Sequence, residues 1–186
     1  MNFSILFSIY ISNIFSPELI ALLTVLFVCL LFFYLYLKKF DFKILLSKHC
    51  PNQIKSMLLL FISVILSSFL VIIFKHYFKI QRPENMMVWE SGYSFPSGHA
   101  TLSFTLAFMI IYIIFKYFFN HRKYVNYLYS ALFLSIATTV SFSRIILNVH
   151  RPIDIIGGIL FAFISTYLSI KIYYNINKYV DKKIIK

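Results

Sequence analysis

Two residues capable of phosphate chemistry lie in one short break between apolar stretches, in the segment "SRIILNVHRPIDIIGG". There, His150 and Asp154 are four residues apart. Pro152 suits the first turn of a helix, and residues four apart on a helix are neighbours, so Asp154 can reach back toward His150. A carboxylate on one imidazole nitrogen fixes the tautomer and leaves the other nitrogen available as a nucleophile. Taken alone, the pair is also consistent with an ordinary ion pair in a loop.

A second break, "SGYSFPSGHATLSF", precedes another long apolar stretch. Ser97 is placed to cap the helix that follows, and Gly98 lets a ligand approach the backbone. The N–H groups at a helix start, together with the helix dipole, form an anion-binding site. His99 stands at its mouth, where it could give a proton to a bound anion. Taken alone, the segment is also consistent with an ordinary helix cap beside a hydrated histidine.

The third cluster is the segment "KHYFKIQRP", in which Lys75 and Arg82 are seven residues apart. If the preceding apolar helix extends through this segment, Lys75, Lys79 and Arg82 share one of its faces, and Pro83 then turns the chain. Arg144 ends a further apolar stretch just before the His150 break. Basic residues at helix ends also reach toward the membrane interface, so this segment alone assigns no function.

The three breaks together suit phosphoryl transfer to a histidine. The sequence shows neither a Cys/His cluster for zinc nor a dense carboxylate set for magnesium, so we expect no metal and no cofactor. His150 would attack phosphorus, His99 would protonate the leaving oxygen, and water would hydrolyse the phosphohistidine. Cations and backbone N–H groups would stabilise the charge on the phosphate oxygens. The groups expected to hold these oxygens are Lys75, Arg82, Ser97, Gly98 and Arg144.

The composition places these breaks in a membrane protein. The chain has 186 residues, of which 60% are hydrophobic and 13% are charged, and its mean hydropathy is +0.81. Several stretches approach the roughly 20 apolar residues that cross a bilayer. The net charge of +12 is dispersed between these stretches, so we expect membrane lipids as partners and no nucleic acid. The oligomeric state is left open.

The apolar stretches predict an all-α, polytopic transmembrane helical bundle. Residues 3–15 span only about 20 Å as a helix, so an interfacial helix is expected there. The bundle then has five spans, or six if residues 3–15 cross, in a single domain over residues 1–186 whose motif-bearing core covers about 54–173. The predicted spans are Pro17–Leu37, Ile54–Phe74, His99–Phe119, Tyr127–Leu147 and Ile153–Tyr173.

Small residues spaced by four predict close packing of the helices that carry the polar breaks, because such residues let membrane helices approach each other. The stripes are Ser103 and Ala107; Thr139, Ser135 and Ala131; and Gly158, Ala162 and Thr166.

The loop charges predict the orientation. With five spans, thirteen of the 18 Lys and Arg residues fall on one side, and the side richer in Lys and Arg is normally cytoplasmic. We therefore expect an inner (cytoplasmic) membrane protein whose polar breaks face the periplasm or the exterior. The cations on that side are Lys75, Lys79, Arg82, Arg144 and Arg151.

The three breaks resemble the signature motifs of the type 2 phosphatidic acid phosphatase (PAP2) superfamily. Lys75 to Pro83 reads K-x6-R-P, Pro96 to His99 reads P-S-G-H, and Ser143 to Asp154 reads S-R-x5-H-x3-D, with no departure within the motifs. The resemblance implies that His150 is the nucleophile, oriented by Asp154, and that His99 is the acid. It also implies that Lys75, Arg82, Ser97, Gly98 and Arg144 bind phosphate.

The resemblance also implies a class of reaction and several substrates. We expect a membrane lipid phosphatase acting on undecaprenyl diphosphate, lipid A, phosphatidylglycerophosphate or phosphatidate, through a phosphohistidine and without metal. Two alternatives stay open: a lipid phosphotransferase that uses the same histidine, and a non-catalytic protein that binds or transports lipid phosphates. Trp89, Tyr93, Glu84 and Glu90 are expected mainly to anchor their loop, with the two glutamates as further candidates for headgroup contact.

Overall fold

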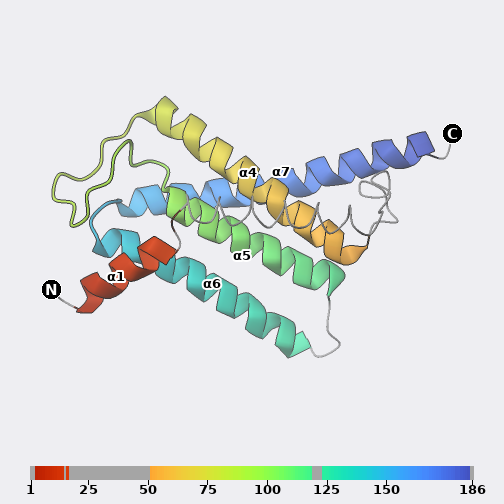
Figure 1. Ribbon diagram of the computed structural model, residues 1–186, viewed down its shortest axis with the longest axis horizontal. Coiled ribbons are helices and arrows are strands. Elements are labelled where there is room, and N and C mark those ends of the chain that lie inside the picture. Colours follow the sequence, from red (N-terminus) through yellow and green to blue (C-terminus); the bar gives the residue numbers. More distant parts are fainter. Residues whose placement is uncertain (1–2, 15, 17–50, 119–122, 185–186) are drawn as a thin grey trace, which may run out of the picture.

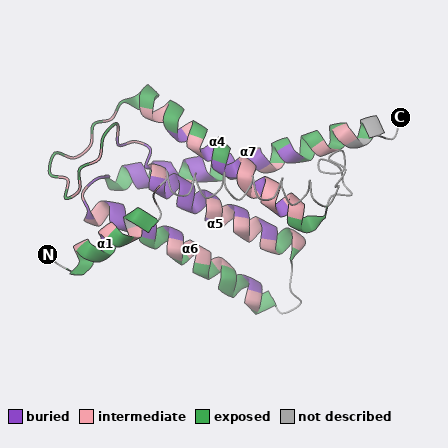
Figure 2. Ribbon diagram, in the orientation of Figure 1, coloured by how far each residue is buried: buried purple, intermediate pink, exposed green. Residues whose placement is uncertain are grey.

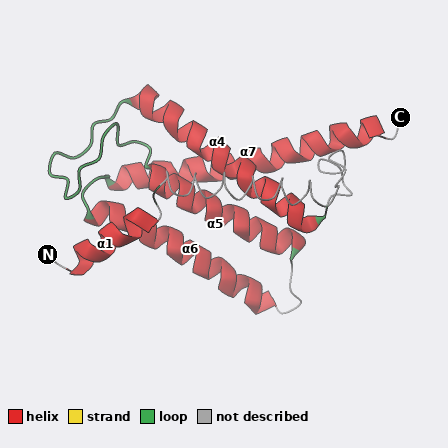
Figure 3. Cartoon of the chain, in the orientation of Figure 1, coloured by secondary structure: helices red, strands yellow, loops and turns green. Residues whose placement is uncertain are grey.

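The computed structural model describes residues 3–14, 16, 51–118 and 123–184, and within these residues the chain is helical, without strands (Figure 3). Four of the described helices, α4 to α7, are long and apolar enough to cross a membrane. The predicted all-α, multi-span architecture is therefore confirmed, while the predicted span Pro17–Leu37 lies outside the described residues. The described helices are α1 (Phe3–Ile14), α4 (Asn52–Phe78), α5 (Gly98–Tyr117), α6 (Lys123–Ile146) and α7 (Pro152–Ile184).

Helix α1 packs against α6 near one end of the bundle (Figure 1). Its 12 residues extend about 18 Å at 1.5 Å per residue. That length falls short of the roughly 30 Å of a bilayer's hydrocarbon core. The placement of this helix at the membrane interface stays a prediction.

Helix α7 is longer than the sequence predicts. It begins at Pro152, where proline suits the first helical turn, and it continues to Ile184 rather than ending near Tyr173. Lys178, Lys182 and Lys183 therefore lie on the helix, beyond the end of the predicted span. In Figure 1, α7 starts at the end where the chain leaves α4 and finishes at the opposite end of the bundle.

Helix α5 forms the centre of the bundle, because it contacts α4, α6 and α7. Its first half is almost continuously buried (Figure 2). At its middle, Phe104 and Ala107 pack with Ala137 of α6 and Ala162 of α7. The start of α5 is therefore fixed from several sides, and this start carries the Ser97–His99 motif.

Helices α5 and α7 approach closely through small residues, as predicted. A Cβ atom added to Gly158 would lie 2.9 Å from the Ala100 Cβ and 3.0 Å from the Ser97 carbonyl oxygen, so only glycine fits there without a shift. One layer deeper, the hydroxyl groups of Thr105 and Ser165 are 3.1 Å apart and join the two helices.

The predicted small-residue stripe on α6 is wrong. Ala131, Ser135 and Thr139 are exposed, and Ala137 and Ser141 are buried instead. Positions two residues apart on a helix differ by about 200° in direction, so the two stripes lie on opposite faces. The position of Arg144 explains which face of α6 turns inward. Arg144 is fully buried, and it lies on the same face of the helix as Ala137 and Ser141.

Many large apolar side chains remain on the outside of α4, α6 and α7. A soluble protein rarely exposes this much contiguous apolar surface, whereas lipid tails are suitable neighbours for it. This surface and the four long apolar helices show a multi-pass membrane protein. The exposed residues include Phe69, Ile72, Leu128, Phe142, Leu160 and Phe163.

Candidate active site

The three polar breaks meet at one end of the bundle. The segment between α4 and α5 and the short turn between α6 and α7 lie together at the left of Figure 1, next to α1. Between them is a cavity of about 410 Å³. Its wall includes Glu90 and residues from all three breaks: Lys75, Arg82, Gly98, His99 and His150.

His150 lies in this cavity with Asp154 behind it. The Nδ1 atom of His150 is 3.4 Å from Oδ2 of Asp154, and the same carboxylate oxygen accepts a hydrogen bond from the Arg151 backbone N–H at 2.9 Å. Only 2% of His150 is exposed. This arrangement confirms the predicted reach of Asp154 and places Nε2 of His150 as the ring nitrogen away from the carboxylate.

The surroundings of His150 favour its neutral form. Burial lowers the pKa of this imidazole from 6.5 to about 4, against the opposing effect of the hydrogen bond to Asp154. The positive charges of Arg82, Lys75 and Arg144 lower the same pKa further. At neutral pH the imidazole therefore keeps a lone pair, which a nucleophile requires.

Arg82 joins the first break to the third. Its Nη1 atom is 3.3 Å from Nε2 of His150 and donates to the Val149 carbonyl oxygen at 3.1 Å. Its Nε donates to the Gly92 carbonyl oxygen at 3.2 Å. The guanidinium is thus held beside the imidazole atom that faces away from Asp154.

The predicted common helical face of Lys75, Lys79 and Arg82 is wrong. Helix α4 ends at Phe78, and Lys79 is its C-cap in the left-handed conformation, with φ of 51°. Arg82 therefore lies in the following loop and approaches the cavity from there, while Lys75 remains on the helix and donates to the Tyr93 carbonyl oxygen. A left-handed residue ends the helical register, which the spacing of charges does not reveal.

Glu90 connects the two arginines of the site. One carboxylate oxygen is 2.9 Å from Nη1 of Arg82, and the other pairs with Nη2 of Arg144. The Arg144 side chain is fully buried, whereas that of Glu90 keeps 25% of its surface exposed. From its sequence position, Glu90 was expected only to anchor its loop or to contact a headgroup. The sequence did contain one signal that Glu90 could belong to the site: the chain has only six acidic residues, so a carboxylate beside the motifs is unusual.

The PSGH segment forms the start of α5 at the cavity wall. Ser97 is the N-cap, and its hydroxyl accepts a hydrogen bond from the Ala100 backbone N–H at 3.5 Å, as predicted. The Ser97 backbone N–H donates to the Asp154 carbonyl oxygen at 3.1 Å, which ties the second break to the third. Gly98 and His99 line the cavity, where the dipole of the helix favours an anion.

The residues predicted from the sequence therefore fall into two groups. Lys75, Arg82, Gly98, His99 and His150 line the cavity. Ser97, Arg144 and Asp154 lie behind this wall, where each is fully buried and contacts another part of the site.

Lys79 and Arg151, the other two cations expected on this side of the membrane, do not line this cavity. Lys79 caps α4, and Arg151 supplies only its backbone N–H to Asp154. In the part of the chain that the structure describes, no three His, Cys, Asp or Glu side chains are grouped to hold a metal ion.

This geometry defines a class of protein: a membrane-spanning helical bundle with a cationic, two-histidine cavity at one end. Comparison with known families identifies the family. The family model of the PAP2 superfamily matches residues 56–178, which is more than half of the chain. The chain belongs to the PAP2 superfamily, as the three motifs predict.

A relative with an assigned name agrees with this assignment. The chain is 32% identical over 84 residues to phosphatidylglycerophosphatase B of Bacillus subtilis (strain 168), a match that covers 44% of this chain and 40% of the relative. The matched region thus spans less than half of that protein's length.

Two crystal structures share the fold. One is the PAP2-type phosphatidylglycerolphosphate phosphatase from Bacillus subtilis, with a TM-score of 0.70 and 21% identity, covering 94% of this chain and 79% of that one. The other is Aquifex aeolicus LpxE, with a TM-score of 0.59 and 22% identity, covering 90% of this chain and 85% of that one.

Proposed function

We propose that this protein is a membrane lipid phosphatase that uses His150 as its nucleophile. The observation that carries the proposal is the meeting of His99 and His150 in one cavity with Lys75 and Arg82. The cavity gathers, from three separate segments, the cations that bind a phosphate and the two groups that move protons and bonds at phosphorus.

In the first step, Nε2 of His150 attacks phosphorus and the bond between phosphorus and the lipid oxygen breaks. Asp154 contacts Nδ1, so it orients the ring and stabilises the positive charge that develops on it. His99 donates a proton to the departing lipid oxygen. Lys75, Arg82 and the start of α5 at Gly98 bind the phosphate oxygens. Arg144 adds positive charge from behind the cavity wall, and Ser97 caps the helix start there.

In the second step, water attacks the phosphorus of the phosphohistidine. His99, which has lost its proton to the lipid, now accepts one from this water. The bond between phosphorus and Nε2 breaks, and inorganic phosphate and neutral His150 are regenerated. This sequence of steps uses protein groups and water, and it needs no metal ion or cofactor.

A phosphate monoester on a glycerophospholipid is the first substrate to test. Phosphatidylglycerophosphate has priority because a relative and a structural neighbour carry that substrate in their names. Phosphatidate, lipid A and undecaprenyl diphosphate remain the other members of the panel. An incoming phosphate also has to compete with Glu90, whose carboxylate contacts Arg82 and Arg144.

We place the active site on the periplasmic or exterior side of the inner membrane, because the opposite end of the bundle carries most of the lysines that the structure describes. We also propose that the chain forms a single catalytic domain, with its core at about residues 54–173.

The test is release of inorganic phosphate by the purified protein in detergent, with phosphatidylglycerophosphate, phosphatidate, lipid A and undecaprenyl diphosphate compared. Substituting His150→Ala removes the nucleophile and should lower the rate by at least about a thousandfold. A rapid quench should also trap acid-labile phosphate on the wild-type protein and none on the variant. Equal rates in the two proteins would refute the mechanism.

Lys79→Gln is the matched control, since it removes a cation from the same end of the bundle outside the cavity wall. It should keep most of the activity. If labelled phosphate passes to an added lipid acceptor without release, the protein is a phosphotransferase. If every lipid phosphate binds and none is cleaved, it is a binding protein.

A further inference from the structure

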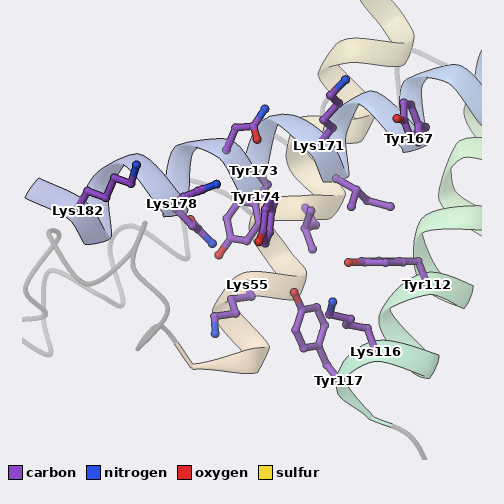
Figure 4. Close-up of a pocket in the computed structure, with 14 residues that line it drawn as sticks. Lys55, Tyr112, Lys116, Tyr117, Tyr167, Lys171, Tyr173, Tyr174, Lys178 and Lys182 are labelled. Atoms are coloured by element: carbon purple, nitrogen blue, oxygen red, sulfur yellow. The ribbon is translucent and has the colours of Figure 1, made fainter.

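We propose that a second cavity, at the end of the bundle opposite the active site, binds the headgroup of an anionic phospholipid. This cavity has a volume of about 820 Å³ and lies between α4, α5 and α7 (Figure 4). None of the active-site residues lines it, so its ligand is separate from the phosphate bound beside His150.

The charge of the cavity wall is entirely positive among the described residues. Of the 14 that line it, five are lysines and none is acidic. Because Lys171, Lys178 and Lys182 are spaced by seven and four, they lie along one side of α7. In Figure 4 these three lie along one edge of the cavity, opposite Lys55 of α4 and Lys116 of α5.

The charge of this wall favours an anionic ligand. Like charges one helical turn apart, such as Lys178 and Lys182, repel each other and destabilise a helix. A bound anion between α5 and α7 relieves that repulsion and joins the two helices. Anionic headgroups bind in this way to basic pockets between membrane helices.

The rest of the wall favours a lipid over a soluble anion. Leu59, Ile170 and the rings of several tyrosines line the cavity between the lysines. Two lysines already lie over tyrosine rings: Lys116 is 5.9 Å from the Tyr112 ring centre, and Lys171 is 6.0 Å from that of Tyr167. Tyrosine is enriched where membrane helices meet the headgroup region. Such a wall presents apolar surface to acyl chains and ammonium groups to a phosphate.

Asn177 adds a polar group inside the cavity. Its Oδ1 atom is buried and has no hydrogen-bond partner within the part of the chain that the structure describes. A hydroxyl-bearing headgroup can donate to this amide oxygen while its phosphate contacts the lysines. Phosphatidylglycerol has both features, so it is the probe of choice.

The experiment measures lipid binding to the full chain in detergent by native mass spectrometry. Wild-type protein should bind phosphatidylglycerol at least about tenfold more tightly than phosphatidylcholine, since several lysines face the anionic headgroup and each contributes to its binding. The variant Lys116→Gln/Lys178→Gln/Lys182→Gln should lose that preference. Lys123→Gln, at the same end but outside the cavity wall, should keep it.

Three outcomes would overturn the proposal: equal binding of the two lipids by the wild type, unchanged preference in the triple variant, or loss of preference in Arg82→Ala instead. The last would place the lipid in the active site. Glycerol 1-phosphate added at the concentration of the lipid should not compete, and full competition would assign the cavity to soluble anions. If the triple variant elutes as aggregate, the exposed pair Lys178→Gln/Lys182→Gln gives the same comparison.

Discussion

Arg82 and His150 are 68 positions apart in the sequence, and Nη1 of the arginine lies 3.3 Å from Nε2 of the histidine. Asp154 contacts the other ring nitrogen, so Nε2 is the atom left to attack phosphorus. A phosphate held by the Arg82 guanidinium is therefore placed next to its nucleophile.

Substituting Arg82→Lys should lower kcat/KM by about a hundredfold, because an ammonium group lacks the planar fork that binds two phosphate oxygens. The charge is kept, so binding of inorganic phosphate should fall less than the rate. Kinetics of phosphate release over a range of lipid concentrations separates the two effects. An unchanged kcat/KM would show that Arg82 does not contact the reacting phosphate.

Asp154→Asn should lower kcat by about a hundred- to a thousandfold, because the charge that stabilises the imidazolium is lost while the shape is kept. KM should change little, since Asp154 lies behind the cavity wall. Arg151→Gln is the control, because only the backbone N–H of Arg151 contacts Asp154. A fall in activity caused entirely by unfolding would appear as a lower melting temperature and would contradict the assignment.

The pH dependence follows from the pKa of His150, which burial lowers to about 4. Above that value the imidazole is neutral and able to attack, and protonation inactivates it as the pH falls through about 4. An ordinary histidine would instead lose activity below about 6.5. An NMR titration of protein with isotope-labelled histidines measures the pKa of His150 separately from that of the substrate. The variant His150→Gln assigns the signal. A midpoint near 6.5 would contradict the burial argument.

Glu90→Gln should strengthen phosphate binding. The carboxylate contacts both Arg82 and Arg144, so its removal leaves more positive charge for the substrate. We expect KM for the lipid and the inhibition constant of inorganic phosphate to fall together by about three- to tenfold, which corresponds to about 1 kcal/mol. Glu84→Gln, in the same loop, serves as the control. A rise in both constants would mean that Glu90 chiefly keeps the arginines in place.

Gly158→Ala should destabilise the bundle by about 1–3 kcal/mol, although alanine favours helix more than glycine does. The new methyl group would lie 3.0 Å from the Ser97 carbonyl oxygen, so α5 has to shift at the point where it enters the active site. Thermal unfolding in detergent and the rate of phosphate release should fall together. Ile156→Ala, at an exposed position of the same helix, should leave both nearly unchanged.

Much of this protein is determined by local sequence. Runs of apolar residues of membrane-spanning length require helices, because a helix satisfies its backbone hydrogen bonds within the segment. Pro152 and Ser97 mark helix starts through their own backbone and side-chain chemistry, and the four-residue spacing of His150 and Asp154 brings them together. These features depend on neighbours in the chain, so they were predicted correctly.

Other features were decided by packing between distant segments. The left-handed Lys79 ends α4 before Arg82, which reaches His150 from the following loop. The burial of Arg144 selects the inner face of α6, which turned the predicted stripe of Ala131, Ser135 and Thr139 outward. Charge spacing and small-residue spacing describe one helix at a time, and they carry no information about its rotation against its neighbours.

Glu90 shows most clearly the difference between what local sequence determines and what packing determines. From the sequence, Glu90 is a carboxylate in a polar loop. Only the tertiary structure brings this carboxylate between Arg82 and Arg144, and Arg144 is 54 residues away in the sequence. The sequence determined which groups the site contains, because motifs preserve residue types and local spacing. The tertiary structure decided which charges meet, because the cost of burying a charge depends on the partners that folding brings to it.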